Sequence, residues 1–262
     1  MRWSTLRHSG GQWSGREDVL TVEGPVEYRI GGVPIAVLMR TPGRDAPLGL
    51  GFLLTEGIVI EPDEVASIHP VEDTASGDRY DIELADGVII DPEQFRRNMF
   101  VSSSCGVCGK ASIESVMIAR RTPPSGPTVP PSFVTSLPGK MRDHQRQFDE
   151  TGSLHAAAAV LADGTLLALE EDVGRHNAVD KVVGVLASGA WPPSELILVV
   201  SGRIGFEITQ KAAVVGIPIV AGISGASSLA IELGREAGMT VIGFVRDDGF
   251  NLYTGAERVE TS

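Results

Sequence analysis

The sequence predicts an α/β protein in two parts: a C-terminal layered domain, in which helices cover a mostly parallel sheet, and a smaller N-terminal α+β region. Two observations lead to this prediction. From residue 152 onward, apolar segments of strand length alternate with segments of helical periodicity, which is typical of helices packed on a sheet. Before that point, residues 122–131 hold five prolines and favour a linker between the two parts.

These observations divide the chain into four segments. Residues 1–18 are rich in Gly, Ser, Trp and charged residues without a period, so we expect a loose N-terminal extension. The α+β region occupies residues 19–121, the proline-rich linker residues 122–131, and the C-terminal domain residues 132–262. The sequence shows no internal repeat and no coiled-coil heptads, which excludes a repeat architecture.

A glycine turn defines the first strands of the N-terminal region. Residues 26–30 and 33–39 flank Gly31-Gly32, a pair that is typical of a tight β-hairpin turn. The other elements expected here are a helix at 48–60, strands at 80–84 and 88–91 joined through Asp86-Gly87, and a helix from 110 to about 120.

The C-terminal domain is expected to begin with a helix at 141–148 and a hairpin. The hairpin strands are residues 154–161 and 166–169, joined across Asp163-Gly164. The elements that follow are a helix at 177–188, a strand at 196–200, a helix at 206–215, a strand at 217–221, a helix at 227–238 and a strand at 240–245.

The charge of the chain limits its partners. The net charge of the 262 residues is −12, which argues against binding to nucleic acid or to an anionic membrane surface. No apolar stretch is long enough to span a bilayer, and no targeting segment is visible. We therefore expect a soluble, cytoplasmic protein that holds any anionic ligand through a local group of cations and backbone N–H groups.

The two cysteines of the chain, Cys105 and Cys108, lie in one CxxC motif. The motif follows three serines, has glycines on both sides and leads into the expected helix from residue 110. A thiol near a helix N-terminus has its thiolate stabilised by the helix dipole, and Lys110 adds positive charge. This environment favours sulfur or redox chemistry at Cys105.

Three other interpretations of the CxxC motif stay open at this point. A structural zinc site would need two more ligands, which His144, His155 or His176 could supply. A thioredoxin-like redox pair would need a preceding strand in a βαβ unit, which the sequence does not clearly show. A pair of buried small side chains is disfavoured by the serines and glycines around it.

A second group of polar residues lies at the strand-to-helix junction of residues 171–181. Asn177 is in position to cap the helix, with Asp180 as the acidic residue that reaches back to the cap. Capping leaves Arg175, His176 and Lys181 without a role; Arg175 and Lys181 are expected in solvent.

Glycine- and serine-rich turns follow three successive strands of the expected sheet. They comprise Ser201-Gly202-Arg203, residues 224–228, and residues 244–249 with Arg246. Turns at the carboxyl ends of strands expose backbone N–H groups that suit phosphate, and the two arginines add charge. Together they predict a phosphorylated ligand, such as a nucleotide.

The order of elements in the C-terminal domain is that of the cytidine-deaminase-like fold, but the residues exclude the deaminase reaction. A zinc deaminase needs H-x-E or C-x-E on the first helix and P-C-x-x-C at the next one. Here His176-Asn177-Ala178 and Ser201-Gly202-Arg203 stand at these places. The zinc ligands and the proton-shuttling glutamate are absent, and we expect no structural metal.

Seven blocks of the sequence resemble one known family, the formate dehydrogenase accessory sulfurtransferases of the FdhD type. The resemblance runs from about residue 20 to 255. The blocks are RTPG at 40–43, GFLLTEG at 51–57, CGVCG at 105–109, LHAA at 154–157, DVGRHNAVDK at 172–181, SGR at 201–203 and GFVR at 243–246.

The resemblance implies a function. Family members accept sulfur from a cysteine desulfurase as a persulfide and deliver it to the molybdenum bis(molybdopterin guanine dinucleotide) cofactor of formate dehydrogenase. The persulfide cysteine matches Cys105, with Cys108 as its partner on the loop. The family also tends to form homodimers and is similar to cytidine deaminases in fold.

The resemblance also implies a cofactor-binding segment, to which we add Arg203 from the turns described above. A guanine dinucleotide agrees with those turns, and GDP is the expected mimic. Family members often carry a further basic residue where this chain has Gly249 after two aspartates, so Arg246 would contribute more of the phosphate contact. The segment comprises Phe244, Val245, Arg246, Asp247, Asp248 and Gly249.

One alternative function stays open. The protein could be a chaperone that binds the molybdenum cofactor without sulfurating it, with a structural CxxC motif that either binds zinc or does not.

Overall fold

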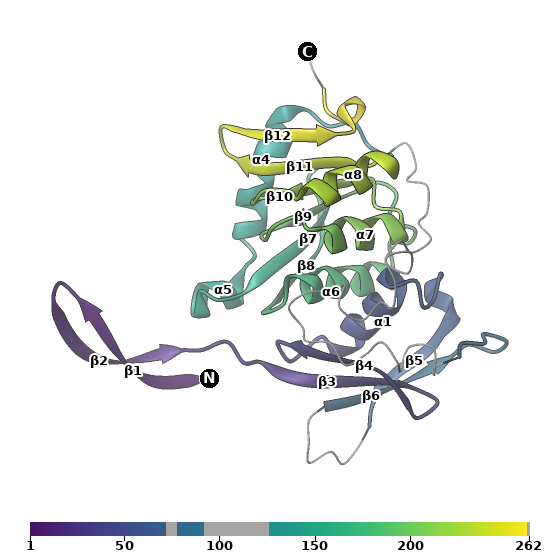
Figure 1. Cartoon of the computed structure of the whole chain (residues 1–262), viewed down its shortest axis with the longest axis horizontal. Helices are drawn as coiled ribbons and strands as arrows, with labels where there is room; N and C mark the ends of the chain where they lie inside the picture. Colours follow the sequence, from purple (N-terminus) through teal and green to yellow (C-terminus); the bar gives the residue numbers. More distant parts are fainter. Residues whose placement is uncertain (72–77, 92–125, 261–262) are drawn as a thin grey trace.

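The structure, a computed structural model, describes residues 1–71, 78–91 and 126–260. Within these ranges the strands form a two-stranded, a four-stranded and a six-stranded sheet (Figure 1). The expected helix at 110–120 lies outside the described residues.

The six-stranded sheet forms the C-terminal domain and has the order β12-β11-β10-β9-β7-β8. The strand β9 is apolar (LILVV) and buried along its whole length, as expected for a central strand covered on both faces. The strands are β7 (His155–Leu161), β8 (Leu166–Asp172), β9 (Leu196–Val200), β10 (Ile219–Gly222), β11 (Thr240–Arg246) and β12 (Gly249–Thr254).

The expectation of a mostly parallel sheet is wrong. Strands β9, β10 and β11 are parallel to one another, but the pairings β7–β8, β7–β9 and β11–β12 are antiparallel. The physical reason is that both edges of the sheet are hairpins, and strands joined by a tight turn run antiparallel. The strand β12, which the sequence analysis missed, closes one of these hairpins.

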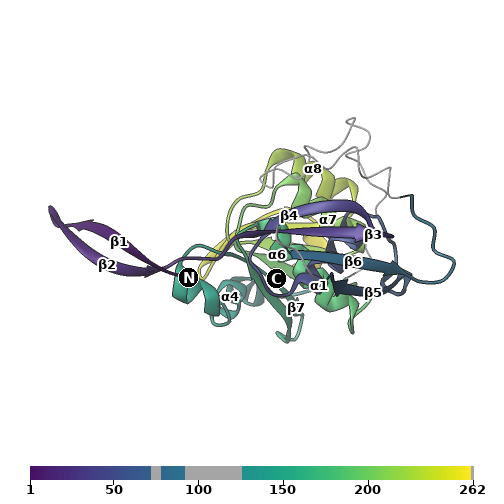
Figure 2. The ribbon, with the colours of Figure 1, turned by 90° about the horizontal axis from the view of Figure 1, so that it is seen from below.

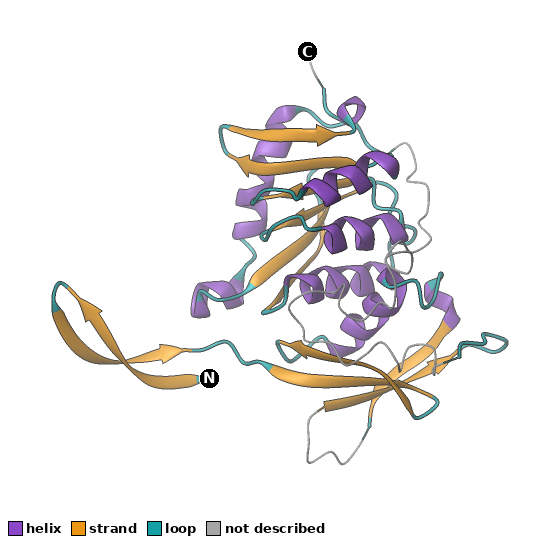
Figure 3. Ribbon diagram, in the orientation of Figure 1, coloured by secondary structure: helices purple, strands orange, loops and turns teal. Residues whose placement is uncertain are grey.

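Helices cover both faces of this sheet (Figure 3). Three of them, predicted from their periodicity and confirmed with slightly different ends, pack on one face: α6 (Arg175–Ala187), α7 (Phe206–Val215) and α8 (Ser228–Glu236). The helix α4 (Pro131–Arg142) packs on the other face, where Val134, Leu137 and Met141 are buried against the sheet. The sheet therefore separates two hydrophobic clusters.

The expectations around residues 122–148 need correction. A helix was expected at 141–148, and residue 131 was assigned to the linker. Instead α4 begins at Pro131 and ends at Arg142, and a separate helix, α5 (Arg146–Thr151), follows. Proline is compatible with the first position of a helix, because its missing N–H would have no partner there.

The four-stranded sheet has the order β4-β3-β6-β5 and packs against the helix α1. The predicted hairpin around Gly31-Gly32 is confirmed: β3 and β4 pair antiparallel, and the two glycines have φ of 57° and 77°. These left-handed values are what a tight hairpin turn requires. The elements are β3 (Gly24–Ile30), β4 (Val33–Arg40), α1 (Asp45–Thr55), β5 (Val65–Pro70) and β6 (Asp78–Leu84).

Two expectations in this region are wrong. The helix expected at 48–60 ends at Thr55, because the chain turns at Gly57, whose φ is 67°. Residues 88–91 form no strand; the antiparallel partner of β6 is β5, which lies earlier in the chain. The hairpin expected across Asp86-Gly87 therefore does not form.

The helices α1 and α6 touch through their backbones. A Cβ atom built at Gly51 of α1 would lie 1.7 Å from the carbonyl oxygen of Asp180, and one built at Gly184 of α6 would lie 1.9 Å from the carbonyl oxygen of Pro47. Only glycine permits this approach. One hydrophobic cluster consequently continues from the four-stranded sheet into the C-terminal domain.

The N-terminal segment is a regular hairpin rather than a loose extension, which corrects the expectation for residues 1–18. Strands β1 (Arg2–Ser9) and β2 (Gln12–Val19) pair along their full length and join at Gly10-Gly11, with φ of 59° and 80°. Because nearly all side chains of the hairpin are exposed, its sequence lacks the clean alternation of a half-buried strand. Figure 1 shows it projecting away from the larger sheets.

Candidate functional site

The carboxyl ends of β9, β10 and β11 lie at one edge of the six-stranded sheet, because these three strands are adjacent and parallel. The turn after β9 carries Arg203, and β11 ends at Arg246. Both side chains are exposed. The structure thus brings together the turns that the sequence analysis identified separately.

The three turns are hydrogen-bonded to one another. The Ile204 N–H donates to the Gly225 carbonyl (3.1 Å), and the Ser227 N–H donates to the Ile204 carbonyl (3.0 Å). The Phe244 N–H donates to the Ser224 carbonyl (3.1 Å). These bonds join the turns after β9, β10 and β11 into one continuous surface.

The segment 244–249 presents an aromatic ring and a cation at this edge. Phe244 has a left-handed φ of 53°, is 49 % exposed, and its ring lies so close to Gly225 that a Cβ atom there would be 2.7 Å away. The Arg246 guanidinium donates to the Ile223 and Val245 carbonyls, which hold its charge beside the turn after β10. A flat apolar face and a fixed positive charge therefore lie on adjacent turns.

The other residues of the segment contribute less to a ligand surface. Val245 is 2 % exposed and faces the core. Asp247 and Asp248 form the exposed two-residue turn between β11 and β12. Gly249 is the first residue of β12. Their carboxylates would repel phosphate, so Arg246 and Phe244 are the side chains of this segment best suited to bind a nucleotide.

The N-terminus of α6 joins the same edge. A Cβ atom at Gly202 would lie 3.4 Å from Nδ1 of His155 and 3.5 Å from Cδ of Arg175, so the turn after β9 packs directly on these side chains. Gly174 is the N-cap residue, and no side chain caps the helix. Its first N–H groups are available at the positive end of the helix dipole.

The capping role expected for Asn177 and Asp180 is wrong. The Asn177 side chain donates to the Met39 carbonyl (2.7 Å) and to a carboxylate oxygen of Asp172 (3.0 Å). Asp180 is buried and faces Lys211 on α7 at 2.9 Å. Both residues make contacts across the core, which a local capping pattern in the sequence cannot reveal.

Two buried nitrogen atoms at this junction have no hydrogen-bond partner among the described residues: Nε of Arg175 and Nε2 of His176. Nε2 of His176 lies 3.8 Å from a carboxylate oxygen of Glu207. Buried polar atoms are normally paired, so these two indicate a place where a ligand or water supplies the missing bond. The sequence analysis left Arg175 and His176 without a role; the glycines at 174 and 202 were the available indication.

His176 is neutral at pH 7. Burial, together with the nearby positive charges of Lys211 and Arg175, lowers the pKa of His176 to about 3. Burial and Arg175 also lower the pKa of His155. A neutral imidazole offers one donor and one acceptor nitrogen, so His176 can bond a ligand in either sense.

Buried charges fix the helices behind the edge. Nζ of Lys211 lies 2.9 Å from carboxylate oxygens of Asp180 and Glu56 and donates to the Thr55 hydroxyl at 2.9 Å. Although burial acts to lower the pKa of Lys211, these carboxylates raise it overall, so the amine stays charged. The network connects α1, α6 and α7.

Lys181 is also buried, contrary to the expectation that it would be in solvent. It is 1 % exposed, lies 2.7 Å from a carboxylate oxygen of Asp172 and donates to the Thr41 carbonyl at 2.9 Å. Arg175 is half-buried at the α6 N-terminus. Lys181 therefore joins residues 40–43 to the C-terminal domain.

The predicted sulfur-carrying residues Cys105 and Cys108 lie outside the described residues, as does Lys110. Across residues 1–71, 78–91 and 126–260, no group of three or more His, Cys, Asp or Glu side chains is arranged to hold a metal ion. The expectation of no structural metal stays a prediction.

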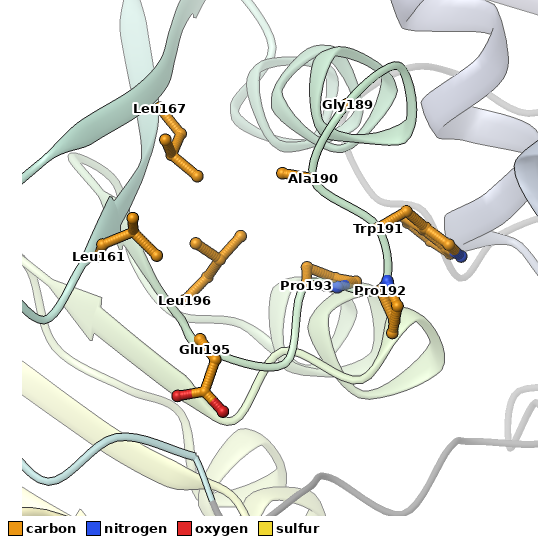
Figure 4. A pocket seen from close by; sticks show the side chains of 9 residues that line it. All are labelled: Leu161, Leu167, Gly189, Ala190, Trp191, Pro192, Pro193, Glu195 and Leu196. Carbon is orange, nitrogen blue, oxygen red and sulfur yellow. The ribbon is translucent and has the colours of Figure 1, made fainter.

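A pocket of about 230 Å³ lies at the opposite end of the sheet (Figure 4). It lies where β7 ends and β9 begins, so it is remote from the carboxyl ends of the parallel strands. Its lining is mostly apolar and holds no cation suited to phosphate: Leu161, Leu167, Gly189, Ala190, Trp191, Pro192, Pro193, Glu195 and Leu196.

Within the described part of the chain, none of the helices combines the length and the hydropathy needed to cross a membrane.

Comparisons with known proteins agree on one family. The model of the FdhD/NarQ family matches residues 21–260. A "Sulfur carrier protein FdhD" from Streptomyces avermitilis is 44% identical over 98% of this chain and 95% of its own length. Proteins of the same name from Mycolicibacterium paratuberculosis and Mycobacterium tuberculosis are 46% and 43% identical over 96% and 97% of this chain, and over 95% and 96% of their own lengths.

A solved structure shows the same fold. It is the crystal structure of a candidate formate dehydrogenase accessory protein from Desulfotalea psychrophila, which matches with a TM-score of 0.78 at 22% identity and covers 99% of both chains.

Proposed function

The chain belongs to the FdhD/NarQ family, and on this premise we propose that it is a sulfur carrier, a sulfurtransferase that serves formate dehydrogenase. The observation that carries the proposal is the similarity of at least 43% to sulfur carrier proteins along nearly the whole chain. The CxxC motif supplies the thiols that such a carrier needs.

In the proposed loading step, the Cys105 thiolate attacks the terminal sulfur of a persulfide on a cysteine desulfurase. A new sulfur–sulfur bond forms at Cys105, the sulfur–sulfur bond of the donor breaks, and the donor leaves as a thiolate. The exchange needs no external oxidant or reductant, because one persulfide replaces another.

In the proposed delivery step, the sulfur leaves Cys105 for the molybdenum of the bis(molybdopterin guanine dinucleotide) cofactor, which is the substrate. Release as sulfide requires two electrons. Attack of the Cys108 thiolate on the sulfur of Cys105 would supply them, because it leaves a Cys105–Cys108 disulfide and expels sulfide. Reduction of that disulfide by a cellular thiol would restore the carrier.

The carboxyl edge of the six-stranded sheet supports binding of a guanine dinucleotide. Phe244 offers an exposed face on which a base can stack, while Arg203 and Arg246 offer charge to its phosphates. The Nε of Arg175 and the Nε2 of His176, which have no hydrogen-bond partner in the described part of the chain, lie at the same junction. They lie beside a helix N-terminus that no described side chain caps and that favours anions. We propose GDP as a mimic of this part of the cofactor, and no structural metal.

The partners of the proposed function follow from the two steps. A cysteine desulfurase donates the sulfur, and formate dehydrogenase receives the sulfurated cofactor. We also propose that the protein is a homodimer.

The decisive experiment compares Cys105→Ala with Cys108→Ala. Each protein is incubated with a cysteine desulfurase and cysteine, desalted, and assayed for sulfur released by cyanide. Wild type and Cys108→Ala should load similarly, whereas Cys105→Ala should carry only background sulfur. Cys108→Ala should release its sulfur more slowly.

Full loading of Cys105→Ala would refute its assignment as the carrier. If none of the three proteins loads but all bind GDP equally, the protein is a cofactor chaperone that does not sulfurate. Zinc at about one ion per chain that is lost in both variants would identify the CxxC motif as structural.

A further inference from the structure

The N-terminal hairpin, hereafter the arm (residues 1–20), projects from the molecule. Figure 1 and Figure 2 both show it extending away from the larger sheets, and its two strands pair only with each other. A two-stranded hairpin is marginally stable in water unless something packs on it. The described residues of one copy leave most of the arm uncovered, so a further covering surface would stabilise it.

One face of the arm carries exposed apolar side chains toward its tip. The register places His8 opposite Trp13 and Leu6 opposite Gly15, so these residues share a face. Leu6 and Trp13 are each 70 % exposed, and the His8 ring packs on the Trp13 ring with 4.9 Å between centroids. Trp3 lies on the other face of β1 because it is an odd number of residues away.

Two further apolar side chains are exposed at the base of the arm. Leu20 is 40 % exposed and Val22 is 47 % exposed, just where the chain enters the four-stranded sheet. The register of the hairpin places position 20 on the face of Trp3, so Leu20 is not part of the Leu6 and Trp13 face.

We propose that the arm of one chain packs, through the face that carries Leu6 and Trp13, against the body of a second copy, which returns its own arm across a two-fold axis. In such an arrangement Leu6 and Trp13 of both copies become buried. The proposal adds an interface to the homodimer proposed above and is independent of the sulfur chemistry.

Charge selects a second copy as the occupant. The arm carries Arg2, Arg7 and Arg16 against Glu17 and Asp18, a net charge of +1. The whole chain carries −12, so residues 21–262 carry −13. A basic arm is attracted to an acidic body of this kind, whereas two bodies without arms would repel each other.

The size of the arm also fits reciprocal exchange. A stable interface uses about 20–30 residues on each side. The two strands of one arm supply 16 residues, which is too few for a one-way contact. When each copy contributes its arm and the surface that receives the other arm, the interface reaches the usual size. Such a two-fold arrangement leaves no arm free for a third copy, so the assembly stops at a dimer.

The comparisons place the arm outside the family core but inside the shared fold. The family model begins at residue 21, immediately after the arm. The solved structure nevertheless covers 99% of this chain, which leaves too few residues to omit the arm. The structural match thus extends over the arm, which lies outside the family model.

The test measures the oligomeric state of the full chain by sedimentation velocity between about 1 and 100 μM, the range of a moderate dimer. Leu6→Asp with Trp13→Asp removes the apolar face, Trp13→Ser is a milder change on the same face, and Trp3→Asp is the matched control on the opposite face. Loss of a buried Trp anchor should weaken dimerisation by about thirtyfold or more.

We expect wild type and Trp3→Asp to form dimers with the same dissociation constant. Trp13→Ser should dissociate at higher concentrations, and the double variant should be a monomer that retains the circular dichroism of the folded body. Because the body packs without the arm, loss of the dimer should leave sulfur loading on Cys105 measurable in the same samples.

Three results would overturn the inference. A wild-type monomer at every concentration would remove both the arm exchange and the proposed homodimer. A dimer that is unchanged in the double variant would keep the homodimer and remove the arm from its interface. A wild-type monomer that binds a desulfurase only when Leu6 and Trp13 are intact would assign the face to that partner instead.

Discussion

Replacement of Gly51 by alanine should strongly destabilise the protein, because α1 and α6 cross with their backbones in contact. The added methyl carbon would start 1.7 Å from the Asp180 carbonyl oxygen and 2.9 Å from the Gly184 nitrogen. Both neighbours are main-chain atoms of α6, so no side chain can rotate away. The helices must separate instead.

The size of the effect follows from these distances. Real Cβ atoms essentially never approach another atom within 3.0 Å, so the helices must move apart by at least about 1.3 Å at this point. Overpacking of a core typically costs about 1–3 kcal/mol, and a rigid contact that disturbs a whole helix pair belongs at or above the upper limit. The total free energy of unfolding of a domain is only about 5–15 kcal/mol.

Gly139 provides the matched control. It also lies within a helix, α4, but a Cβ atom there would meet nothing within 4 Å. Alanine is the better helix former by about 1 kcal/mol, so Gly139→Ala should slightly stabilise the protein. The same substitution is thus expected to have opposite effects at two helical glycines.

Urea unfolding monitored by circular dichroism measures both effects. Gly51→Ala should lower the free energy of unfolding by about 3 kcal/mol or more, or give an insoluble protein, while Gly139→Ala should match or exceed wild type. A loss below about 1 kcal/mol in Gly51→Ala, or equal losses in the two variants, would refute the close helix contact.

Three further predictions concern charged groups. Lys211→Met should lower the free energy of unfolding by about 3–5 kcal/mol, because it leaves the Asp180 carboxylate buried without its ion-pair partner. Adding Asp180→Asn should restore part of that loss in urea unfolding. Strictly additive losses in the two single variants and the double variant would contradict the ion pair. Because the pKa of His176 is depressed in the folded protein, the imidazole binds a proton at higher pH in the unfolded chain than in the folded one. The free energy of unfolding should therefore fall from pH 6.5 toward pH 3 by at most about 1.4 kcal/mol per pH unit. That slope should be shallower in His176→Gln, and identical slopes in pH-dependent urea titrations would exclude a buried neutral histidine. Arg203→Ala and Arg246→Ala should each weaken GDP binding about tenfold or more in calorimetric titration, and unchanged affinity in both would place the pocket elsewhere.

Local chemistry in the sequence predicted much of the fold. Gly31-Gly32 forms the tight turn that its residue types favour, and the strand and helix periods after residue 152 located β7 through β11 and the helices between them. These features depend on backbone preferences and on burial of one face, both of which leave a repeating pattern in the sequence.

Features that depend on distant partners were not predictable. Asn177 reads as a helix cap, yet it bonds Met39, which lies 138 residues away. Asp180 fits a local capping pattern in the sequence, but it pairs with Lys211, which lies 31 residues away on α7. The antiparallel edge at β12 was also missed, because this short strand follows a turn of two aspartates that gives only a weak hairpin pattern.

The candidate site was predictable in part. The turns that carry Arg203 and Arg246 follow apolar strands, so their position at one edge followed from the fold class. The participation of Arg175 and His176 could not be predicted, because the contact between Gly202 and Arg175 depends on the position of α6 relative to the sheet. The roles of Cys105 and Cys108 stay predictions from residue type and resemblance.

The hydrogen bonds among the three turns at the carboxyl edge have a consequence for ligand affinity. A loop that becomes ordered only on binding spends part of the interaction energy on its lost conformational entropy. Here the Ile204, Ser227 and Phe244 amides already hold the turns together without a ligand. In the proposed function, a guanine dinucleotide would bind to a surface whose shape is set before the ligand arrives. The movement that brings the carried sulfur to the molybdenum would then have to come from the sulfur carrier segment or from the cofactor, and not from these turns.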